Sequence, residues 1–185
     1  IITTKTAFEN LKSYAQQNGF EIIYEKIKER LILINEIDEK PDYTSEKINP
    51  EDIAFIQYSS GSTGLPKGVI LTHKNLVITS SAYIKKSKIN FNDSFLSWFP
   101  LTHDMGLIGW HITPLLAGIN QVLIETSLFV RRPALWMDKT TEHKSTILCS
   151  PNYGLKHFIG FTKMLDNADW DLSNVRIIAN GAEPI

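Results

Sequence analysis

The stretch SSGSTGLPKG, residues 59–68, directly follows the apolar run 53–56 and decides how the rest of the chain is interpreted. It holds three glycines, four hydroxyl side chains and one lysine, Lys67. Glycines let a loop bring backbone N–H groups close to a ligand, because no Cβ stands in the way and positive φ is allowed. A concave row of such donors suits an anion, and a lysine adds a charge suited to a phosphate oxygen. The residues therefore favour a loop that binds a triphosphate.

The spacing does not match three other glycine motifs. A Walker P-loop requires Gly-Lys followed by Ser or Thr, whereas Lys67 lies between Pro66 and Gly68. The dinucleotide fingerprint Gly-x-Gly-x-x-Gly is excluded, since no glycine stands two positions before Gly61 or Gly64, and the hydrolase pattern Gly-x-Ser-x-Gly is absent from the stretch. The alternative that remains is a polar hairpin between two strands, in which the glycines serve turn geometry.

The composition is that of an ordinary globular protein, with 43% hydrophobic and 21% charged residues among 185. The net charge of −1 gives no reason to expect nucleic acid or an anionic membrane as a partner. No uninterrupted apolar stretch approaches the roughly 18 residues of a membrane span, and no signal peptide opens the chain. The single cysteine, Cys149, lies in an apolar run, so we expect a buried, inert thiol in a cytoplasmic protein.

Strand and helix patterns alternate along the chain. Short β-branched runs predict strands at residues 20–24, 31–35, 53–59, 69–72, 94–99, 121–125, 145–149 and 175–179. Amphipathic patterns predict helices at residues 6–18, 74–86, 105–117, 133–143 and 153–165. This alternation implies right-handed crossovers, so the predicted fold class is α/β with a largely parallel sheet and flanking helices.

A linker divides the chain into two predicted parts. Residues 36–51 combine two prolines with many charges, which is typical of a linker. We therefore expect residues 1–52 to be the end of a preceding α/β lobe plus this linker, and residues 53–185 to form a second, ligand-binding part. The chain begins with Ile rather than Met and stops directly after a strand pattern. We accordingly expect it to be a fragment of a longer polypeptide.

A second polar group stands in FPLTHDMGLIGW, residues 99–110, where His103 and Asp104 lie between a strand and an apolar helix. Ligands of open α/β sheets gather at the carboxyl ends of strands, so this position suits a site. A plain structural alternative is that Asp104 only caps the helix by accepting a backbone N–H. Neighbouring side chains diverge, so His103 and Asp104 are poorly placed to form a triad with Ser60.

Two further segments follow strands. VRIIANGAEPI, residues 175–185, is an apolar strand that runs into a glycine-containing turn, and the simplest interpretation is a tight turn with Glu183 in solvent. SPNYGLKHF, residues 150–158, has Tyr153, Leu155 and Phe158 at helical spacing, which is typical of ordinary core packing.

The motifs in their order resemble those of the adenylate-forming superfamily. IQYSSGSTGLPK, residues 56–67, resembles its AMP-binding signature throughout, and PLTHDMGL is similar to a second motif, PLFHDMGL, although Thr102 stands where an aromatic residue is common. NGAEP and SPNYGLKHF look most like the fatty acyl-AMP ligase branch. The resemblance runs over residues 53–185 and more loosely over residues 1–52. It implies that the chain is the central part of the large N-terminal domain.

The resemblance also implies roles for individual residues. His103, Lys67 and Thr63 are implied to act in catalysis, His103 by orienting the acid and the α-phosphate. The implied ATP-binding residues are Ser59, Ser60, Gly61, Ser62, Thr63, Gly64, Lys67, Asn180, Gly181, Ala182, Glu183 and Pro184. The implied acid-binding residues are His103, Asp104, Pro151, Asn152 and Tyr153. Further candidates for the walls of an acyl tunnel are Ile108, Trp110, Ile112, Tyr153 and Phe158.

The implied function is the ATP-dependent activation of a carboxylic acid, specifically a fatty acid, as an acyl-adenylate with release of pyrophosphate. The acyl group would then pass to the phosphopantetheine of an acyl carrier protein, as in loading domains of polyketide or nonribosomal peptide synthases. Transfer to CoA by an acyl-CoA synthetase and a non-catalytic nucleotide-binding module remain alternatives. ATP and Mg²⁺ are the implied cofactors. The family's Mg²⁺-binding glutamate and catalytic lysine lie beyond Ile185, so we expect residues 1–185 alone to have no turnover and to need the remainder of the polypeptide.

Overall fold

The computed structural model describes residues 2–37, 47–59, 67–163 and 169–181. The chain divides into two compact units, Ile1–Lys47 and Ile48–Ile185. The roles predicted above for residues 1–52 and 53–185 stay predictions. Within the described residues, the structure contains no helix that is both long and apolar enough to cross a membrane.

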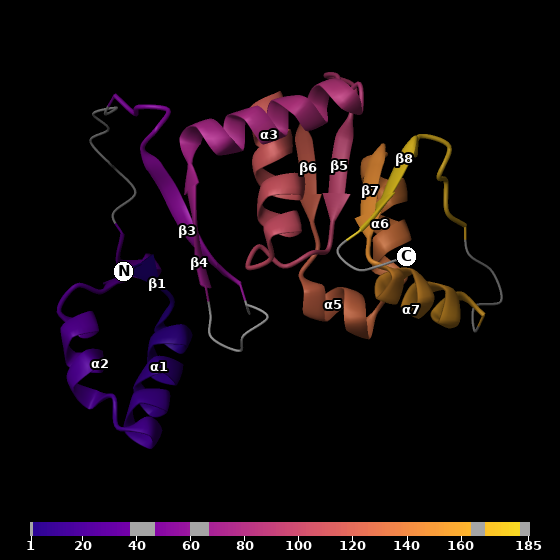
Figure 1. Cartoon of the computed structure of the whole chain (residues 1–185). Coiled ribbons are helices and arrows are strands. Elements are labelled where there is room, and N and C mark those ends of the chain that lie inside the picture. The colour runs from indigo at the N-terminus through magenta and orange to yellow at the C-terminus, as the bar shows by residue number, and fades with distance from the viewer. Residues whose placement is uncertain (1, 38–46, 60–66, 164–168, 182–185) are drawn as a thin grey trace. The chain divides into compact units, whose positions relative to one another are not determined.

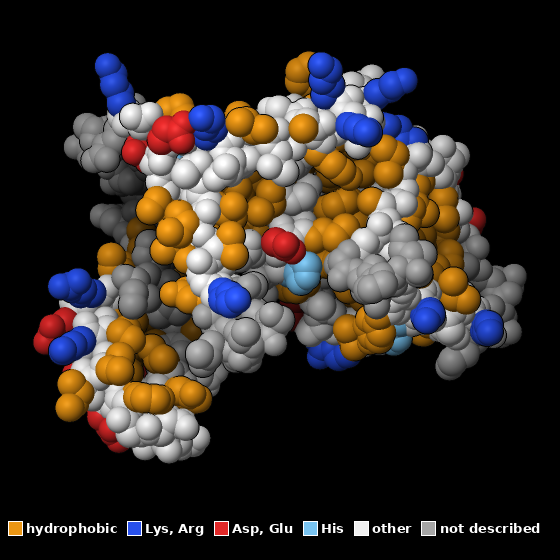
Figure 2. Space-filling view, in the orientation of Figure 1, with side chains coloured by type: hydrophobic (Ala, Val, Ile, Leu, Met, Phe, Trp, Pro, Cys, Tyr) orange, Lys and Arg blue, Asp and Glu red, His pale blue; other side chains and the backbone are white. Residues whose placement is uncertain are grey.

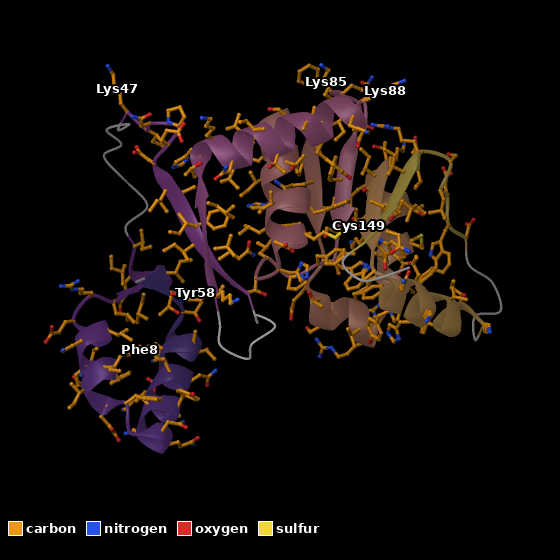
Figure 3. The ribbon with its side chains drawn as sticks, viewed as in Figure 1. Phe8, Lys47, Tyr58, Lys85, Lys88 and Cys149 are labelled. Carbon is orange, nitrogen blue, oxygen red and sulfur yellow. The ribbon has the colours of Figure 1, made fainter. Side chains whose placement is uncertain are left out.

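The first unit is a pair of helices joined to a minimal parallel sheet (Figure 1). Strand β1 (Ile2–Thr3) pairs with β2 (Ile32–Leu33), and α1 (Lys5–Asn18), α2 (Glu21–Lys28) and the 3-10 helix η1 (Ile34–Glu36) make up the rest. Gly19 ends α1 in the left-handed conformation at φ 72°. Phe8 of α1 stacks on Tyr24 of α2 with ring centroids 5.3 Å apart, and Figure 3 shows Phe8 on α1.

Two predicted strands in this unit need correction. Residues 20–24 are not a strand, because α2 occupies residues 21–28. Phe20, Ile23, Tyr24 and Ile27 recur at the three- and four-residue spacing of a helix, and the stacking of Tyr24 on α1 favours that periodicity over the β-branched content. Residues 31–35 form only the two-residue strand β2 before the chain turns into η1.

The second unit carries the predicted parallel sheet. Its strands are arranged in the order β6 (Asn120–Leu123), β5 (Ser94–Ser97), β7 (Ile147–Ser150) and β8 (Ile177–Asn180), and all neighbours are parallel. Figure 1 shows these strands side by side. A separate antiparallel pair, β3 (Ile53–Ser59) and β4 (Lys67–Thr72), precedes the sheet. The α/β fold class with a largely parallel sheet is therefore confirmed.

The helices of the second unit are α3 (His73–Lys86), η2 (Met105–Ile112), α4 (Thr113–Ala117), α5 (Thr126–Arg131), α6 (Leu135–His143) and α7 (Asn152–Thr162). The helix predicted for residues 105–117 is a π-helix, η2, that continues as the α-helix α4. Helix α5 has no counterpart in the prediction. The predicted extension of α7 to residue 165 falls partly outside the described residues.

Aromatic side chains fill the core on both faces of the parallel sheet. One cluster of buried residues consists of Leu96, Trp98, Ile124, Phe129, Trp136, Met137 and Leu148. The other consists of Phe95, Phe99, Trp110, Ile147 and Cys149. Cys149, labelled in Figure 3, lies fully buried on β7, as predicted, and burial raises the pKa of its thiol.

An ion pair joins the amino ends of three strands. The carboxylate of Asp93, which is 5% exposed, accepts two hydrogen bonds from the Arg176 guanidinium at 2.7 and 2.6 Å and one from the Thr146 hydroxyl at 2.7 Å. Asp93 precedes β5, Thr146 precedes β7 and Arg176 precedes β8. These hydrogen bonds, foremost those from Arg176, lower the pKa of Asp93 from 3.8 to about 2.

Candidate active site

An antiparallel pair of strands sets the two ends of the glycine-rich loop. Ser59, the last residue of β3, lies opposite Lys67, the first residue of β4, and Lys67 is exposed. This pairing fits the hairpin alternative as well as a phosphate loop. Five predicted phosphate-binding residues lie outside the described part of the chain: Ser60, Gly61, Ser62, Thr63 and Gly64.

The hairpin borders a cavity next to the second motif. The side-chain amide of Gln57 on β3 donates to the backbone carbonyl of Thr102 at 3.5 Å. We call this cavity of about 390 Å³ the hairpin hollow; Figure 3 labels one of its residues, Tyr58. Its lining residues are Gln57, Tyr58, Val69, Leu71, Thr102, His103, Asp104 and Ile108. The strand that leads into the glycine-rich loop and the turn that carries His103 thus face one cavity.

His103 is held by one edge of its imidazole ring. Its Nδ1 lies 2.8 Å from Oδ1 of Asp104 and 3.1 Å from the backbone nitrogen of Met105, whose N–H also lies within 2.6 Å of that carboxylate oxygen. Asp104 therefore caps η2 as predicted, and it orients the neighbouring histidine in addition. The ring is 45% exposed and tilts against Phe99. Since Nδ1 makes these contacts, Nε2 is the nitrogen directed away from Asp104.

The start of η2 is held against the preceding turn by a glycine. A Cβ added to Gly106 would overlap the backbone carbonyl oxygen of Pro100. The backbone N–H of His103 donates to the same carbonyl at 3.1 Å, and the N–H of Leu107 donates to the carbonyl of His103 at 2.9 Å. A side chain at position 106 would push η2 away from the turn, so the glycine is required for the position of His103.

A second cavity lies on the other side of His103, between α3 and η2. We call this cavity of about 350 Å³ the helix hollow. Its lining residues are Thr79, Tyr83, His103, Asp104, Met105, Ile108, Gly109 and Thr113. A Cβ added to Gly109 would contact no atom within 4 Å. On the face seen in Figure 2, hydrophobic side chains gather below α3. His103 and Asp104 thus separate a hollow beside the phosphate-loop strands from a hollow beside α3.

The third and fourth motifs meet at the carboxyl edge of the sheet. The side-chain amide of Asn180, at the end of β8, donates to the side-chain oxygen of Asn152, at the start of α7, at 2.7 Å. A Cβ added to Gly181 would lie 3.3 Å from Cε of Met105, so the chain after β8 passes directly beside η2. This edge is where open α/β sheets bind ligands. Three predicted residues of this segment, Ala182, Glu183 and Pro184, lie outside the described residues.

Some of the remaining predicted site residues lie in the core, and others are exposed or line a hollow. Pro151 precedes α7, and Tyr153, 54% exposed, stacks on His157 with ring centroids 5.7 Å apart. Trp110 packs against Phe95 and Tyr83 in the core, and Phe158 packs against Trp136 and Trp170. These two aromatic residues line neither hollow, whereas Ile108 lines both.

Sequence reasoning missed the contribution of α3 to the site. Thr79 and Tyr83 are four residues apart and therefore lie on one face of α3, where both line the helix hollow. That spacing is visible in the sequence, but nothing in the pattern indicates that this face meets η2. The described residues contain no group of three or more His, Cys, Asp or Glu side chains that could hold a metal ion.

The chain is similar to known proteins over its full described length. The family described as AMP-binding enzyme matches residues 2–185. A medium-chain-fatty-acid–[acyl-carrier-protein] ligase, JamA, of Moorena producens is 39% identical over 148 residues, which cover 80% of this chain and 24% of that protein. A putative acyl-CoA synthetase of Caulobacter vibrioides is 44% identical over 108 residues, which cover 58% of this chain and 19% of that protein.

A solved structure has the same fold. The fatty acyl-adenylate ligase from L. pneumophila, crystallised with acyl adenylate and pyrophosphate, matches with a TM-score of 0.76 and 34% identity over 84% of this chain and 28% of that one. The chain spans about a quarter of the length of JamA, 24%. The match of this family to residues 2–185 shows that the chain belongs to the family of AMP-binding enzymes.

Proposed function

We propose that the whole protein that carries this sequence activates a fatty acid as an acyl-adenylate, with ATP as co-substrate. The single observation that carries the proposal is that the strands flanking the glycine-rich loop and the segment after β8 both lie beside the turn and helix start that carry His103 and Met105. The strands that flank the glycine-rich loop border the hairpin hollow together with His103. The segment after β8 passes beside Met105 and is tied to α7 by the Asn180–Asn152 hydrogen bond.

The reaction we propose is an in-line displacement at the α-phosphorus of ATP. An oxygen of the carboxylate forms a bond to the α-phosphorus, the bond from that phosphorus to the bridging oxygen breaks, and pyrophosphate leaves. Lys67, Ser59 and the loop between them would hold the β- and γ-phosphates. Such catalysis depends on positioning and on stabilising charge, without a covalent enzyme intermediate. Thr63 is proposed to add a hydroxyl donor to the phosphates.

His103 is proposed to orient the acid and the α-phosphate. Its Nδ1 accepts the backbone N–H of Met105, so in the neutral ring the proton is on Nε2 and can be donated to an oxygen that gains charge in the transition state. Asn180, Gly181 and the three residues after them would lie against adenine. Mg²⁺ is proposed to accompany ATP, but the described residues offer it no ligand cluster, and we assign it no step.

The acid's hydrocarbon chain is proposed to enter the helix hollow. That hollow starts at His103, and its walls include Met105, Ile108 and Tyr83, while Gly109 leaves space within it. Apolar walls with few polar groups are typical of pockets for such ligands. Pro151, Asn152 and Tyr153 would border the entrance from α7.

The acceptor is proposed to be the phosphopantetheine of an acyl carrier protein, which the name of the Moorena relative supports. A second candidate, transfer to CoA, is supported by the similarity to the putative acyl-CoA synthetase of Caulobacter. We further propose a cytoplasmic enzyme, in keeping with its single, buried cysteine. Residues 1–185 alone are proposed to release no pyrophosphate from ATP.

The proposal is tested by acid-dependent exchange of labelled pyrophosphate into ATP in the whole protein. Lys67→Ala is expected to raise the KM for ATP by about 10- to 150-fold, which corresponds to the roughly 1.5 to 3 kcal/mol of a charged hydrogen bond. Lys74→Ala is the matched control, because Lys74 is an exposed lysine that pairs with Glu51 on the surface. Equal ATP dependence in the two variants would remove Lys67 from the phosphate site, and no exchange with any acid would point to the non-catalytic module.

A further inference from the structure

Two buried hydroxyl groups lie where η2 passes into α4. Thr113, the first residue of α4, is 1% exposed, and Ser80 of α3 is fully buried. The Thr113 hydroxyl donates to the backbone carbonyl of Ile108 at 2.8 Å and lies 3.0 Å from the Ser80 hydroxyl oxygen. A hydroxyl has one proton and two lone pairs. The Thr113 hydroxyl oxygen can therefore accept a hydrogen bond from the Ser80 hydroxyl while Thr113 donates its own hydrogen bond to the carbonyl of Ile108.

This arrangement stabilises an unusual backbone. The N–H of Thr113 also donates to the carbonyl of Ile108, five residues earlier, which is the hydrogen-bond spacing of a π-helix. In an α-helix that N–H would donate to the carbonyl of residue 109 instead. The Ile108 carbonyl thus accepts both the backbone N–H and the hydroxyl of Thr113. A side-chain hydrogen bond to the same carbonyl favours the π spacing over the α spacing at this turn.

The same helix positions the candidate catalytic group. Asp104 and Met105, at its start, hold the Nδ1 edge of His103. Ile108 lies one helical turn further on and lines both hollows, and Thr113 itself lines the helix hollow. A π-helix has more residues in each turn than an α-helix, so a change from one to the other rotates every side chain that precedes the change. A change of register at Thr113 would therefore turn the start of η2, which carries the residues that hold His103.

We propose that Thr113 and Ser80 are positioning residues for the adenylation reaction: their hydroxyl pair holds η2 in the π register and, through it, His103 and the wall of the helix hollow. The proposal rests on the function proposed above for this site. It assigns no contact between either hydroxyl and a substrate. The proposal follows from three observations. Both hydroxyls are buried, the Thr113 hydroxyl lies within hydrogen-bond distance of the Ser80 hydroxyl and the Ile108 carbonyl, and that carbonyl also accepts the backbone N–H of Thr113.

The chain offers a matched control for the test. Thr140 on α6 is also 1% exposed, and its hydroxyl donates to a backbone carbonyl, that of Trp136, at 2.7 Å. Thr140→Val and Thr113→Val remove the same buried hydroxyl from the same residue type at nearly constant shape. Thr113→Ser keeps the hydroxyl and removes only a methyl group. A general loss of stability should follow from both valine variants, whereas a positioning role belongs to Thr113 alone.

The experiment compares these variants in the whole protein by acid-dependent ATP–pyrophosphate exchange and by amide hydrogen exchange of η2. For Thr113→Val we expect kcat to fall on the order of 10- to 100-fold with a smaller change in the KM for ATP, as for misplaced catalytic groups. Thr113→Ser should restore most of kcat, and Thr140→Val should leave it close to wild type. Amides of residues 105–112 should exchange faster in Thr113→Val than in Thr140→Val.

The outcomes separate the two proposals. If the wild-type protein exchanges no pyrophosphate with any acid, the proposed function fails, while the amide exchange of η2 still tests the hydroxyl pair. If the wild type is active and Thr113→Val matches Thr140→Val in both kcat and amide exchange, the positioning role is wrong. Failure of Thr113→Ser to recover activity would also overturn it, because the hydroxyl would then not be the group that matters.

Discussion

The ion pair of Asp93 with Arg176 predicts a defined dependence of stability on pH. Asp93 is 5% exposed and has a pKa of about 2 in the folded state, against 3.8 for an ordinary aspartate. A carboxyl whose pKa is lowered by folding contributes stability above its unfolded pKa and loses it as the pH falls through the folded value. The shift corresponds to about 2.5 kcal/mol at neutral pH, of which about 1 kcal/mol is lost between pH 6 and pH 3.

The substitution Asp93→Asn removes this titration. At pH 6 the variant should unfold more easily than wild type by 2 kcal/mol or more, roughly, because the Arg176 guanidinium then lacks its charged partner. The difference should shrink by about 1 kcal/mol at pH 3, because Asp93 of the unfolded wild-type chain, with its ordinary pKa of 3.8, is then mostly protonated while the folded carboxylate is still mostly ionised. The measurement is urea unfolding of the whole protein at pH 6 and at pH 3, with amide hydrogen exchange in β5 and β7 reporting the stability of these strands. Glu142→Gln, which removes an exposed carboxylate paired with Lys139, is the control.

The reasoning is refuted by two results in this experiment. A difference between wild type and Asp93→Asn that is equal at pH 6 and pH 3 would show that the Asp93 carboxyl does not titrate with a lowered pKa. A variant as stable as wild type at both values would show that the ion pair does not stabilise the amino ends of the strands.

Two further predictions follow from the space around glycines, one for stability and one for the choice of acid. Gly154→Ala should lower the free energy of unfolding by roughly 1 to 3 kcal/mol, because the new Cβ would overlap the ring of Trp98; Gly160→Ala, on the same helix with open space around it, should be neutral or stabilising in the same thermal unfolding assay. Gly109→Leu should fill the helix hollow and shift the preferred acid towards shorter chains, measured as kcat/KM in pyrophosphate exchange. An unchanged chain-length profile in a folded Gly109→Leu protein would place the hydrocarbon elsewhere.

The hydrophobic pattern of the sequence was sufficient to predict the main strands of the second unit. The strand predicted for residues 53–59 has those bounds, because an apolar run ends at a glycine-rich loop. The strands predicted at residues 94–99 and 145–149 are found as β5 and β7 with bounds shifted by up to two residues, and both are buried central strands. The strand predicted at residues 20–24 was wrong, because β-branched content alone does not distinguish a strand from a helix that packs on its neighbour.

Some features of the candidate site could be predicted from the sequence and others could not. The motifs around His103, Asn152 and Asn180 could be identified in sequence, and the structure brings their described residues together. The π-helix could not be predicted, because its apolar pattern is equally typical of an α-helix. Its register depends on the contact between Thr113 and Ser80, which are 33 residues apart and which no local pattern relates.

The central claim is tested most directly by a product analysis of the whole protein. The protein is incubated with MgATP, a series of fatty acids, and either CoA or a holo acyl carrier protein, and mass spectrometry identifies where the acyl group resides. The account predicts acyl-adenylate and pyrophosphate with at least one acid, and acyl transfer to the carrier protein. Transfer to CoA alone would correct the acceptor and leave the site intact. ATP left unchanged in the presence of every acid would contradict the account.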